Sequence, residues 1–335
     1  IWMALTPSIF VLVICRFIVG LGVGVAAMVV PVYLAEVSPR KMRGVIVNLN
    51  VVFIATGQFL ALVICLLLGN RWRWMLGLAG IPSFLQGIGV IFLIESPRWL
   101  YKTRQNEKAV KGLKQIYIEP EEELRPIINE QETEALKVRE FENYGFFNLL
   151  NQLFTKYRAC IIAGWGIQMF QQLWGINTAM YYGPEIMKIA GFGDDDHKEQ
   201  TLISSLPLAG INAIGGIIAL WFIDRLGRRW IMLRTLPFVA LFMWVIGLGM
   251  GLRNYLDDSH KFAHELGKWW AAGGLFFYLL SFAIGMGPTP WTVNSEIYPL
   301  HLRGMGNSMS ATTNWISNFA VSMTFLSLLE DIKFG

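Results

Sequence analysis

Long apolar segments dominate this chain and constrain its fold more than any other feature. Each approaches or exceeds the ~20 residues that a helix needs to cross a ~30 Å hydrocarbon core. With 54% hydrophobic and only 16% charged residues, the chain carries more apolar surface than a soluble protein could bury. The segments run approximately over 10–34, 45–68, 74–93, 160–182, 202–223, 230–252, 269–291 and 305–329. We therefore predict an all-α multi-pass membrane protein with about eight full transmembrane helices.

One sequence pattern, E-x-x-P-x-x-x-R-G, occurs twice. The first copy runs from Glu36 to Gly44 and the second from Glu296 to Gly304, 260 residues later. Six apolar segments separate the copies, so both are expected on the same side of the membrane. A repeat of this kind predicts two helical bundles with the same orientation.

The basic residues are distributed unequally between the two sides. When the loops are assigned alternately, the side with both copies of the pattern carries most of the 28 Lys and Arg residues. Cytoplasmic loops normally carry this excess, so that side is predicted to be cytoplasmic. The polar segment 96–158 lies there as well, and its apolar residues at helical spacing predict short amphipathic helices.

Internal symmetry predicts the domain organisation. We expect a partial N-terminal bundle over 1–95, cytoplasmic linker helices over 96–158 and a C-terminal bundle without its last helix over 159–335. Matching the two repeats also predicts roughly two and a half spans before Ile1 and one after Gly335.

The sequence gives no indication of an enzyme or of a bound cofactor. His260 and His264 have the spacing i and i+4, but neither a Cys residue nor a nearby acidic cluster completes a metal site. No phosphate-binding glycine loop or nucleophile elbow is present. The basic linker also lacks the interleaved aromatic residues of nucleic-acid-binding segments. We therefore predict no enzyme activity, no metal, no cofactor and no nucleic-acid partner.

A set of motifs along the whole chain occurs together in one family of membrane proteins. The motifs begin at Arg16 (R-x-x-x-G-x-G-x-G), Glu95 (E-S-P-R-W), Gly166 (G-I-Q-M-F-Q-Q-L-W-G-I-N), Asp224 (D-R-L-G-R-R), Gly287 (G-P-T-P-W) and Asn314 (N-W-I-S-N). The set resembles the sugar porter family of the major facilitator superfamily. This resemblance implies a fold of two six-helix bundles, incomplete here. Residues 175–182, 208–212 and 293–299 most resemble proton-coupled myo-inositol transporters.

A polar stripe marks the apolar segment 160–182. Gln168, Gln171, Gln172 and Gly175 have the spacing i, i+3, i+4 and i+7, which places three amides on one helix face. Amides suit a neutral solute rich in hydroxyl groups because each offers donors and an acceptor without a charge. The alternative is that the amides only join neighbouring helices. Gly175 is expected to loosen the helix before Asn177.

The resemblance implies further residues that line the solute. The positions that match the family's substrate-lining pattern are Gln58, Gln171, Gln172, Asn177, Asn212, Trp291, Asn314 and Trp315. Gln168 is added only because it shares their helix face. Trp291 follows Pro288 and Pro290, which predicts a kinked helix beside a cavity; the alternative for this indole is an interfacial belt residue.

Acidic and basic residues recur together at the cytoplasmic ends of the segments. We predict that they form ion pairs between helices and gate the cytoplasmic side; the alternative is ordinary positive-inside charge. These residues are Glu36, Arg43, Glu95, Arg98, Asp224, Arg225, Arg228, Arg229, Glu296 and Arg303. Arg16 lies within a segment, and in proton-coupled relatives an acidic residue sits beside this position, so Arg16 is a candidate for proton coupling.

These features predict transport of a neutral polyol or monosaccharide by alternating access, with proton/myo-inositol symport as the leading hypothesis. A hexose facilitator of the same architecture is one alternative, and a non-transporting structural or sensor subunit of a membrane complex is another. The expected partners are the polyol or sugar, protons and the lipid bilayer of the plasma membrane or an organelle. The oligomeric state, the identity of the membrane and the stereochemistry of the solute are left open.

Overall fold

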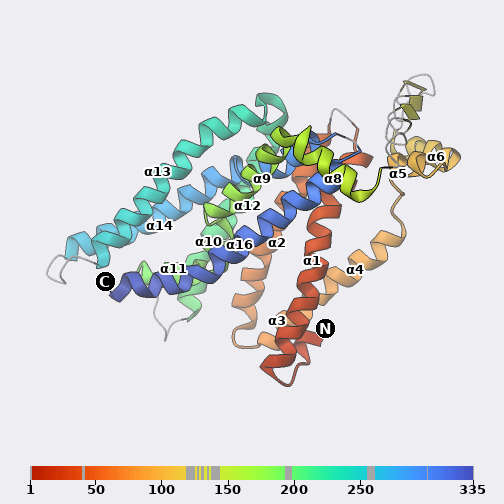
Figure 1. The fold of residues 1–335 in the computed structure, drawn as a ribbon. Helices are drawn as coiled ribbons and strands as arrows, with labels where there is room; N and C mark the ends of the chain where they lie inside the picture. Colours follow the sequence, from red (N-terminus) through yellow and green to blue (C-terminus); the bar gives the residue numbers. More distant parts are fainter. Residues whose placement is uncertain are drawn as a thin grey trace. The chain divides into compact units, whose positions relative to one another are not determined.

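A computed structural model of the chain describes residues 2–39, 42–117, 125–126, 128–129, 132–133, 136, 144–192, 198–254, 261–299 and 301–334. The described secondary structure is helical (Figure 1). The chain divides into two compact units. Unit 1 comprises Ile1–Val47, Asn70–Gly164 and Asn294–Ala311, and unit 2 comprises Asn48–Gly69, Trp165–Val293 and Thr312–Gly335.

Most of the predicted transmembrane segments coincide with helices of membrane-spanning length. In the described part of the chain, six helical stretches are long and apolar enough to cross a bilayer. They correspond to α1 (Ile9–Val37), α2 (Arg43–Leu68), α3 with α4 (Trp72–Leu78, Gly80–Ile91), α12 (Lys198–Leu226), α13 (Arg228–Asn254), and α14 with α15 (Lys261–Ile284, Thr289–Ile297). The all-α expectation is therefore confirmed.

The other two predicted segments have different forms. The segment 160–182 is interrupted, because α9 (Arg158–Leu173) ends before Gly175 and α10 (Ile176–Tyr181) and α11 (Gly183–Ile189) follow it. The segment 305–329 lies within one continuous helix, α16 (Arg303–Phe334). The polar segment 96–158 contains the short helices α5 (Pro97–Lys102), α6 (Asn106–Ile116) and α8 (Phe146–Thr155), as its apolar spacing predicts.

In unit 1, the C-terminal end of α1 is tied to the chain that leads into α5. The Tyr33 hydroxyl donates to the Ile94 carbonyl at 2.7 Å, and the Ser96 hydroxyl donates to Glu36 Oε2 at 2.5 Å. Ser96 is also the N-cap of α5, where its oxygen accepts the Trp99 backbone N–H. One serine therefore fixes both the start of a linker helix and the first acidic residue of the repeated pattern.

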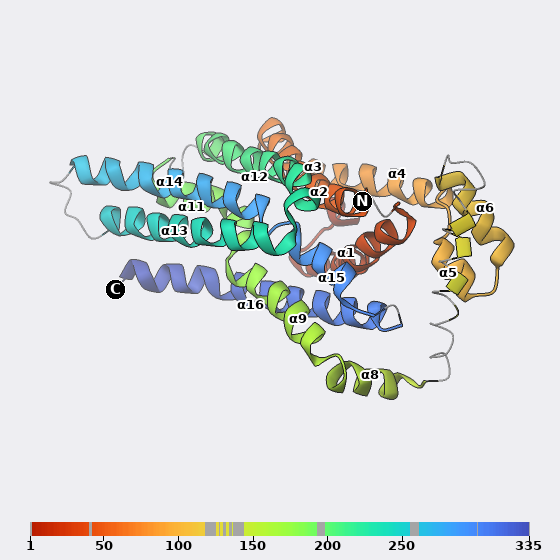
Figure 2. The ribbon, with the colours of Figure 1, turned by 90° about the horizontal axis from the view of Figure 1, so that it is seen from above.

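In unit 2, α14 is the central scaffold. It lies alongside α13 in both views (Figure 1 and Figure 2), and the backbones of the two helices nearly touch. A Cβ on Gly249 would lie 2.5 Å from the Ala271 nitrogen and 2.8 Å from the Gly267 oxygen, closer than real Cβ atoms approach. Small residues at such contacts are typical of helices that pack inside a membrane. On another side of α14, Ala283 packs as closely against Gly215 of α12.

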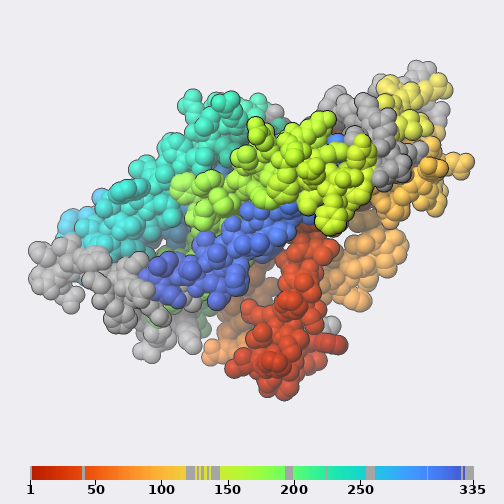
Figure 3. Space-filling view, viewed as in Figure 1, coloured from red at the N-terminus to blue at the C-terminus, as the bar shows by residue number. Residues whose placement is uncertain are grey.

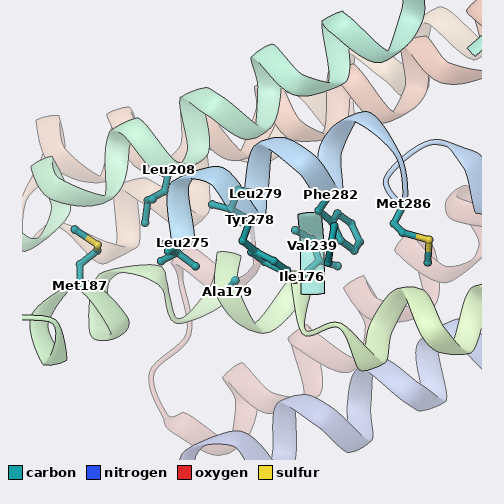
Figure 4. Packing of buried hydrophobic residues seen from close by; sticks show 10 residues of the cluster. All are labelled: Ile176, Ala179, Met187, Leu208, Val239, Leu275, Tyr278, Leu279, Phe282 and Met286. Carbon is teal, nitrogen blue, oxygen red and sulfur yellow. The ribbon is translucent and has the colours of Figure 1, made fainter. Parts of the chain in front are cut away.

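The apolar core of unit 2 lies between these helices and the segment after the α9 interruption (Figure 4). Its buried members are Ile176, Ala179, Met187, Leu208, Val239, Leu275, Tyr278, Leu279, Phe282 and Met286. By contrast, α13 (teal in Figure 3) presents large apolar side chains such as Trp244 at the surface. An apolar face of this kind is stable when lipid, rather than water, covers it.

Candidate functional site

The interruption at Gly175 creates the geometry of the candidate site in unit 2. Gly175 has φ 78° and ψ 22°, a left-handed conformation that glycine adopts without steric cost. Its N–H donates to the Gln172 carbonyl at 2.8 Å, which ends α9, and its own carbonyl accepts the Ala179 N–H, which starts α10. The two helices therefore meet at one glycine, with Gln172 before it and Asn177 after it.

The amides of α9 and Asn314 of α16 form one hydrogen-bond network. Asn314 Nδ2 donates to Gln168 Oε1 at 2.6 Å and to Gln171 Oε1 at 2.9 Å. Asn314 Oδ1 accepts from Gln172 Nε2 at 3.1 Å, and Gln172 Oε1 accepts from Asn177 Nδ2 at 2.9 Å. The spacing argument for a shared face is therefore confirmed for the three glutamines of α9, and Asn314 is the residue on which they converge.

The interruption between α14 and α15 supplies a second set of partners. Gln171 Nε2 donates to the carbonyls of Met286 and Gly287, at 2.7 and 3.0 Å. In a continuous helix the Met286 carbonyl would accept the N–H of residue 290, but that residue is proline and has none. The proline pair thus exposes a carbonyl that an amide from α9 satisfies.

The network is buried and uncharged. Gln168 is 0% exposed, and Gln171, Gln172 and Asn314 are each at most 5% exposed. Most of the amide groups bond to one another or to backbone, so a solute would have to exchange with these hydrogen bonds. Among the described residues, Gln168 Nε2 is a buried donor for which no acceptor is present. Such a donor favours a ligand that carries an oxygen acceptor.

Four predicted solute-lining residues lie in unit 2 outside this network: Gln58 on α2, Asn212 on α12, Trp291 on α15 and Trp315 on α16. All four are half-buried, and no hydrogen bond between described residues joins their side chains to the amides. The α2 segment of unit 2 packs on α12, where Val52 lies 3.5 Å from a Cβ placed on Gly216. Contact of these four predicted residues with a solute stays a prediction.

Two backbone acceptors of the site, the carbonyls of Met286 and Gly287, are not among the residues predicted from the sequence. The signal was available, because a proline in a helical segment leaves the carbonyl four residues earlier without its usual donor. Pro290 marks Met286 in this way. Thr178 of α10 and Thr289 of α15 are further buried side chains whose hydroxyl oxygens have no partner among the described residues.

The predicted gate residues are divided between the two units. In unit 1, Glu36 accepts from Ser96, Glu95 and Glu296 are exposed, and the side chains of Arg43, Arg98 and Arg303 are half-buried. In unit 2, the Arg225 guanidinium lies 5.8 Å from the centre of the Trp221 ring, Arg228 Nη1 lies 3.5 Å from the Ile223 carbonyl, and Arg229 is exposed. Asp224 belongs to the backbone of α12, but its side chain lies outside the described residues. The pairing of these charges stays a prediction.

Arg16 lies near the start of α1 with its side chain exposed in unit 1. This exposure differs from the predicted position enclosed within a span. A role of Arg16 in proton coupling stays a prediction. Among the described residues, no cluster of three or more His, Cys, Asp or Glu side chains could hold a metal ion.

Comparisons with known proteins agree on one family. The family model "Sugar (and other) transporter" matches residues 1–335. The chain is 36% identical to the probable inositol transporter 2 of Arabidopsis thaliana, over 98% of this chain and 70% of the relative. It is 34% identical to the human proton myo-inositol cotransporter, over 95% of this chain and 61% of the relative. The chain therefore spans about two thirds of the length of these relatives.

A solved structure extends the similarity to the fold. The proton:xylose symporter XylE, a major facilitator superfamily protein determined with bound 6-bromo-6-deoxy-D-glucose, superposes with a TM-score of 0.79 at 26% identity. The match covers 96% of this chain and 64% of the XylE chain. Both the sequence and the arrangement of helices are thus similar to those of sugar transporters.

Proposed function

The chain belongs to the sugar porter family of the major facilitator superfamily, and from this premise we propose that the protein carries myo-inositol across a membrane together with protons. Members of this family are integral multi-pass membrane proteins and transporters rather than enzymes. The sequence prediction of this family, of its fold and of a membrane location is therefore confirmed. The particular solute, the coupling ion and the mechanism are our proposals.

One observation supports a neutral solute with many hydroxyl groups: the buried network of Gln168, Gln171, Gln172 and Asn314. Its groups are uncharged, and together they present both donors and acceptors. A hydroxyl group can replace either partner of an amide–amide hydrogen bond, because it donates one and accepts others. Exchange of these bonds for bonds to a polyol therefore requires no buried charge, which would be costly within a bilayer.

The relatives favour inositol over a hexose. The Arabidopsis and human relatives are described as inositol transporters, and the human protein is described as proton-coupled. The same amide chemistry would also suit a hexose, so a facilitator of that kind is the first alternative. We further propose that Arg16 takes part in proton coupling and that the acidic and basic residues at the helix ends bias which side of the membrane is open.

Uptake into proteoliposomes tests the proposal. Labelled myo-inositol should accumulate when the external pH is below the internal pH, excess unlabelled myo-inositol should compete, and D-glucose should compete poorly. Collapse of the pH gradient with a protonophore should abolish accumulation above equilibrium. Preference for D-glucose without response to the gradient would favour the hexose facilitator.

A variant pair separates transport from background leak. Gln171→Leu removes the donor to the Met286 and Gly287 carbonyls and should abolish saturable uptake. Gln152→Leu makes the same chemical change on α8 of unit 1, whereas the network belongs to unit 2, and this variant should transport normally. A folded protein with no saturable uptake of either solute would favour the structural or sensor role instead.

A further inference from the structure

Tyr278 of α14 forms a hydrogen bond at the point where α9 is interrupted. Its hydroxyl donates to the Trp174 carbonyl at 2.6 Å, across 104 residues of sequence. The side chain is 1% exposed, and Figure 4 shows its ring directed from α14 toward Ile176 and Ala179 of α10. Tyr278 therefore contacts both the carbonyl just before the interruption and the helix just after it.

The Trp174 carbonyl needs a donor from outside its own helix. The first backbone bond of α10 runs from the Ala179 N–H to the Gly175 carbonyl, so α10 leaves the preceding carbonyl unused. Among the described residues, the Tyr278 hydroxyl donates a hydrogen bond to this carbonyl. Because water is scarce within a bilayer, an interrupted helix is stable there only when neighbouring groups satisfy the freed backbone atoms.

The position of Tyr278 is restricted because α14 packs closely against a helix on each of two sides. Gly267 and Ala271 of α14 meet Gly249 of α13 at backbone contact distance, and Ala283 of α14 packs closely against Gly215 of α12. Closer approach of α14 to either helix is prevented at these contacts. The scaffold of α12 and α13 therefore restricts where the Tyr278 hydroxyl can lie.

We propose that Tyr278 is a positioning residue for solute binding, which holds the Gly175 interruption so that Gln172 and Asn177 keep their relative placement. This inference rests on the proposed function, because it assigns these two amides to the solute. Gln172 lies before the interruption and Asn177 after it, and their side chains are 2.9 Å apart. Without the hydroxyl, α10 gains freedom to rotate about residues 174 and 175. Solute binding then has to fix the placement of α10 again, which lowers the affinity.

The substitution Tyr278→Phe removes the hydroxyl and keeps the ring in the apolar core. The expected result is an affinity for myo-inositol that is lower by about three- to tenfold, because that is the net contribution of one hydrogen bond. The maximal rate of uptake should be unchanged. Tyr33→Phe is the matched control, because that hydroxyl also donates to a distant backbone carbonyl, Ile94, but lies in unit 1. The Tyr33→Phe variant should bind myo-inositol with the affinity of the wild type.

A double-mutant cycle distinguishes positioning from a general structural role. If Tyr278 acts through Asn177, Tyr278→Phe should lower affinity in the wild-type background and have little further effect in an Asn177→Ala background. Equal effects in both backgrounds would overturn the proposal. If the Phe variant does not fold, Tyr278→Met provides a second removal of the hydroxyl, and failure of both variants to fold would show that Tyr278 is only a core residue.

The same measurements separate this inference from the proposed function. Absence of myo-inositol binding by the wild-type protein would contradict the proposed function itself. Binding by the wild type with unchanged affinity in Tyr278→Phe would contradict only the positioning role.

Discussion

Asn314 Nδ2 lies 2.6 Å from Gln168 Oε1, although 146 residues separate the two in sequence. This contact joins α16 to α9 in unit 2, and Gln171 and Gln172 bond to the same asparagine. A single short side chain thus organises three longer amides.

Asn314→Leu should remove solute binding and lower stability. The change leaves the oxygens of Gln168 and Gln171 without their donor, and each such unsatisfied buried group costs about 1–3 kcal/mol. Thermal unfolding in detergent and equilibrium binding of labelled myo-inositol would measure both effects. Asn318→Leu is the control on the same helix and should retain affinity, since among the described residues the Asn318 side-chain oxygen accepts a local hydrogen bond from Ser322. Equal affinities of the two variants would contradict a central role for Asn314.

Pro290→Ala should weaken solute binding through Gln171. Alanine at 290 provides a backbone N–H for the Met286 carbonyl, which then competes with the Gln171 amide. We expect a decrease in affinity of about tenfold, equivalent to roughly 1.4 kcal/mol. Pro237→Ala, in the interior of α13, changes a helix proline away from the amides and should leave affinity unchanged. Slower hydrogen exchange at residues 286–291 in the Pro290 variant would show that the new backbone bond forms.

Gly249→Ala should destabilise unit 2, whereas Gly247→Ala should not. At Gly249 the added Cβ meets the backbone of Ala271 and Gly267, which cannot move aside cheaply, while at Gly247 nothing lies within 4 Å. Overpacking typically costs about 1–3 kcal/mol, and alanine in an open helix position gains roughly 0.5–1 kcal/mol. Thermal unfolding of the two variants should therefore shift in opposite directions. A similar shift for both would contradict the close packing of α13 on α14.

Acidification should destabilise the protein partly through His301. Burial, aided by the positive charge of Lys156, lowers the pKa of the His301 imidazole below its ordinary value of 6.5. The unfolded chain then binds the proton more readily than the folded protein does. The contribution of His301 to the free energy of unfolding is therefore complete above pH 6.5 and is lost as the pH falls through the lowered pKa. Unfolding temperatures between pH 8 and pH 5, as trial conditions, should fall less steeply for His301→Gln than for the wild type. Parallel curves would contradict the role of His301.

The sequence predicted those features that depend on local order along the chain. Apolar runs predicted the spans, and helical spacing predicted the shared face of Gln168, Gln171 and Gln172. Gly175 was expected to loosen its helix, and its left-handed conformation does so. These are properties of neighbouring residues and need no knowledge of tertiary packing.

Tertiary packing determines the remainder of the site. Resemblance nominated both Asn212 and Asn314, but only Asn314 joins the described amide network, because that depends on how α16 meets α9. Likewise, the Trp174 carbonyl becomes a functional acceptor only because α14 brings Tyr278 to it. No local pattern specifies either partner.

The backbone contact of Gly249 with Gly267 and Ala271 has a mechanical consequence for unit 2. At this contact the backbones of α13 and α14 meet with no side chain between them, so neither helix can adjust there by a change of rotamer. Sliding of α13 along α14 is therefore disfavoured, and the two helices should move together as one rigid body. Next to this pair lies the interruption between α14 and α15, where the Met286 carbonyl accepts the Gln171 amide, so movement at that interruption would act directly on the amide network.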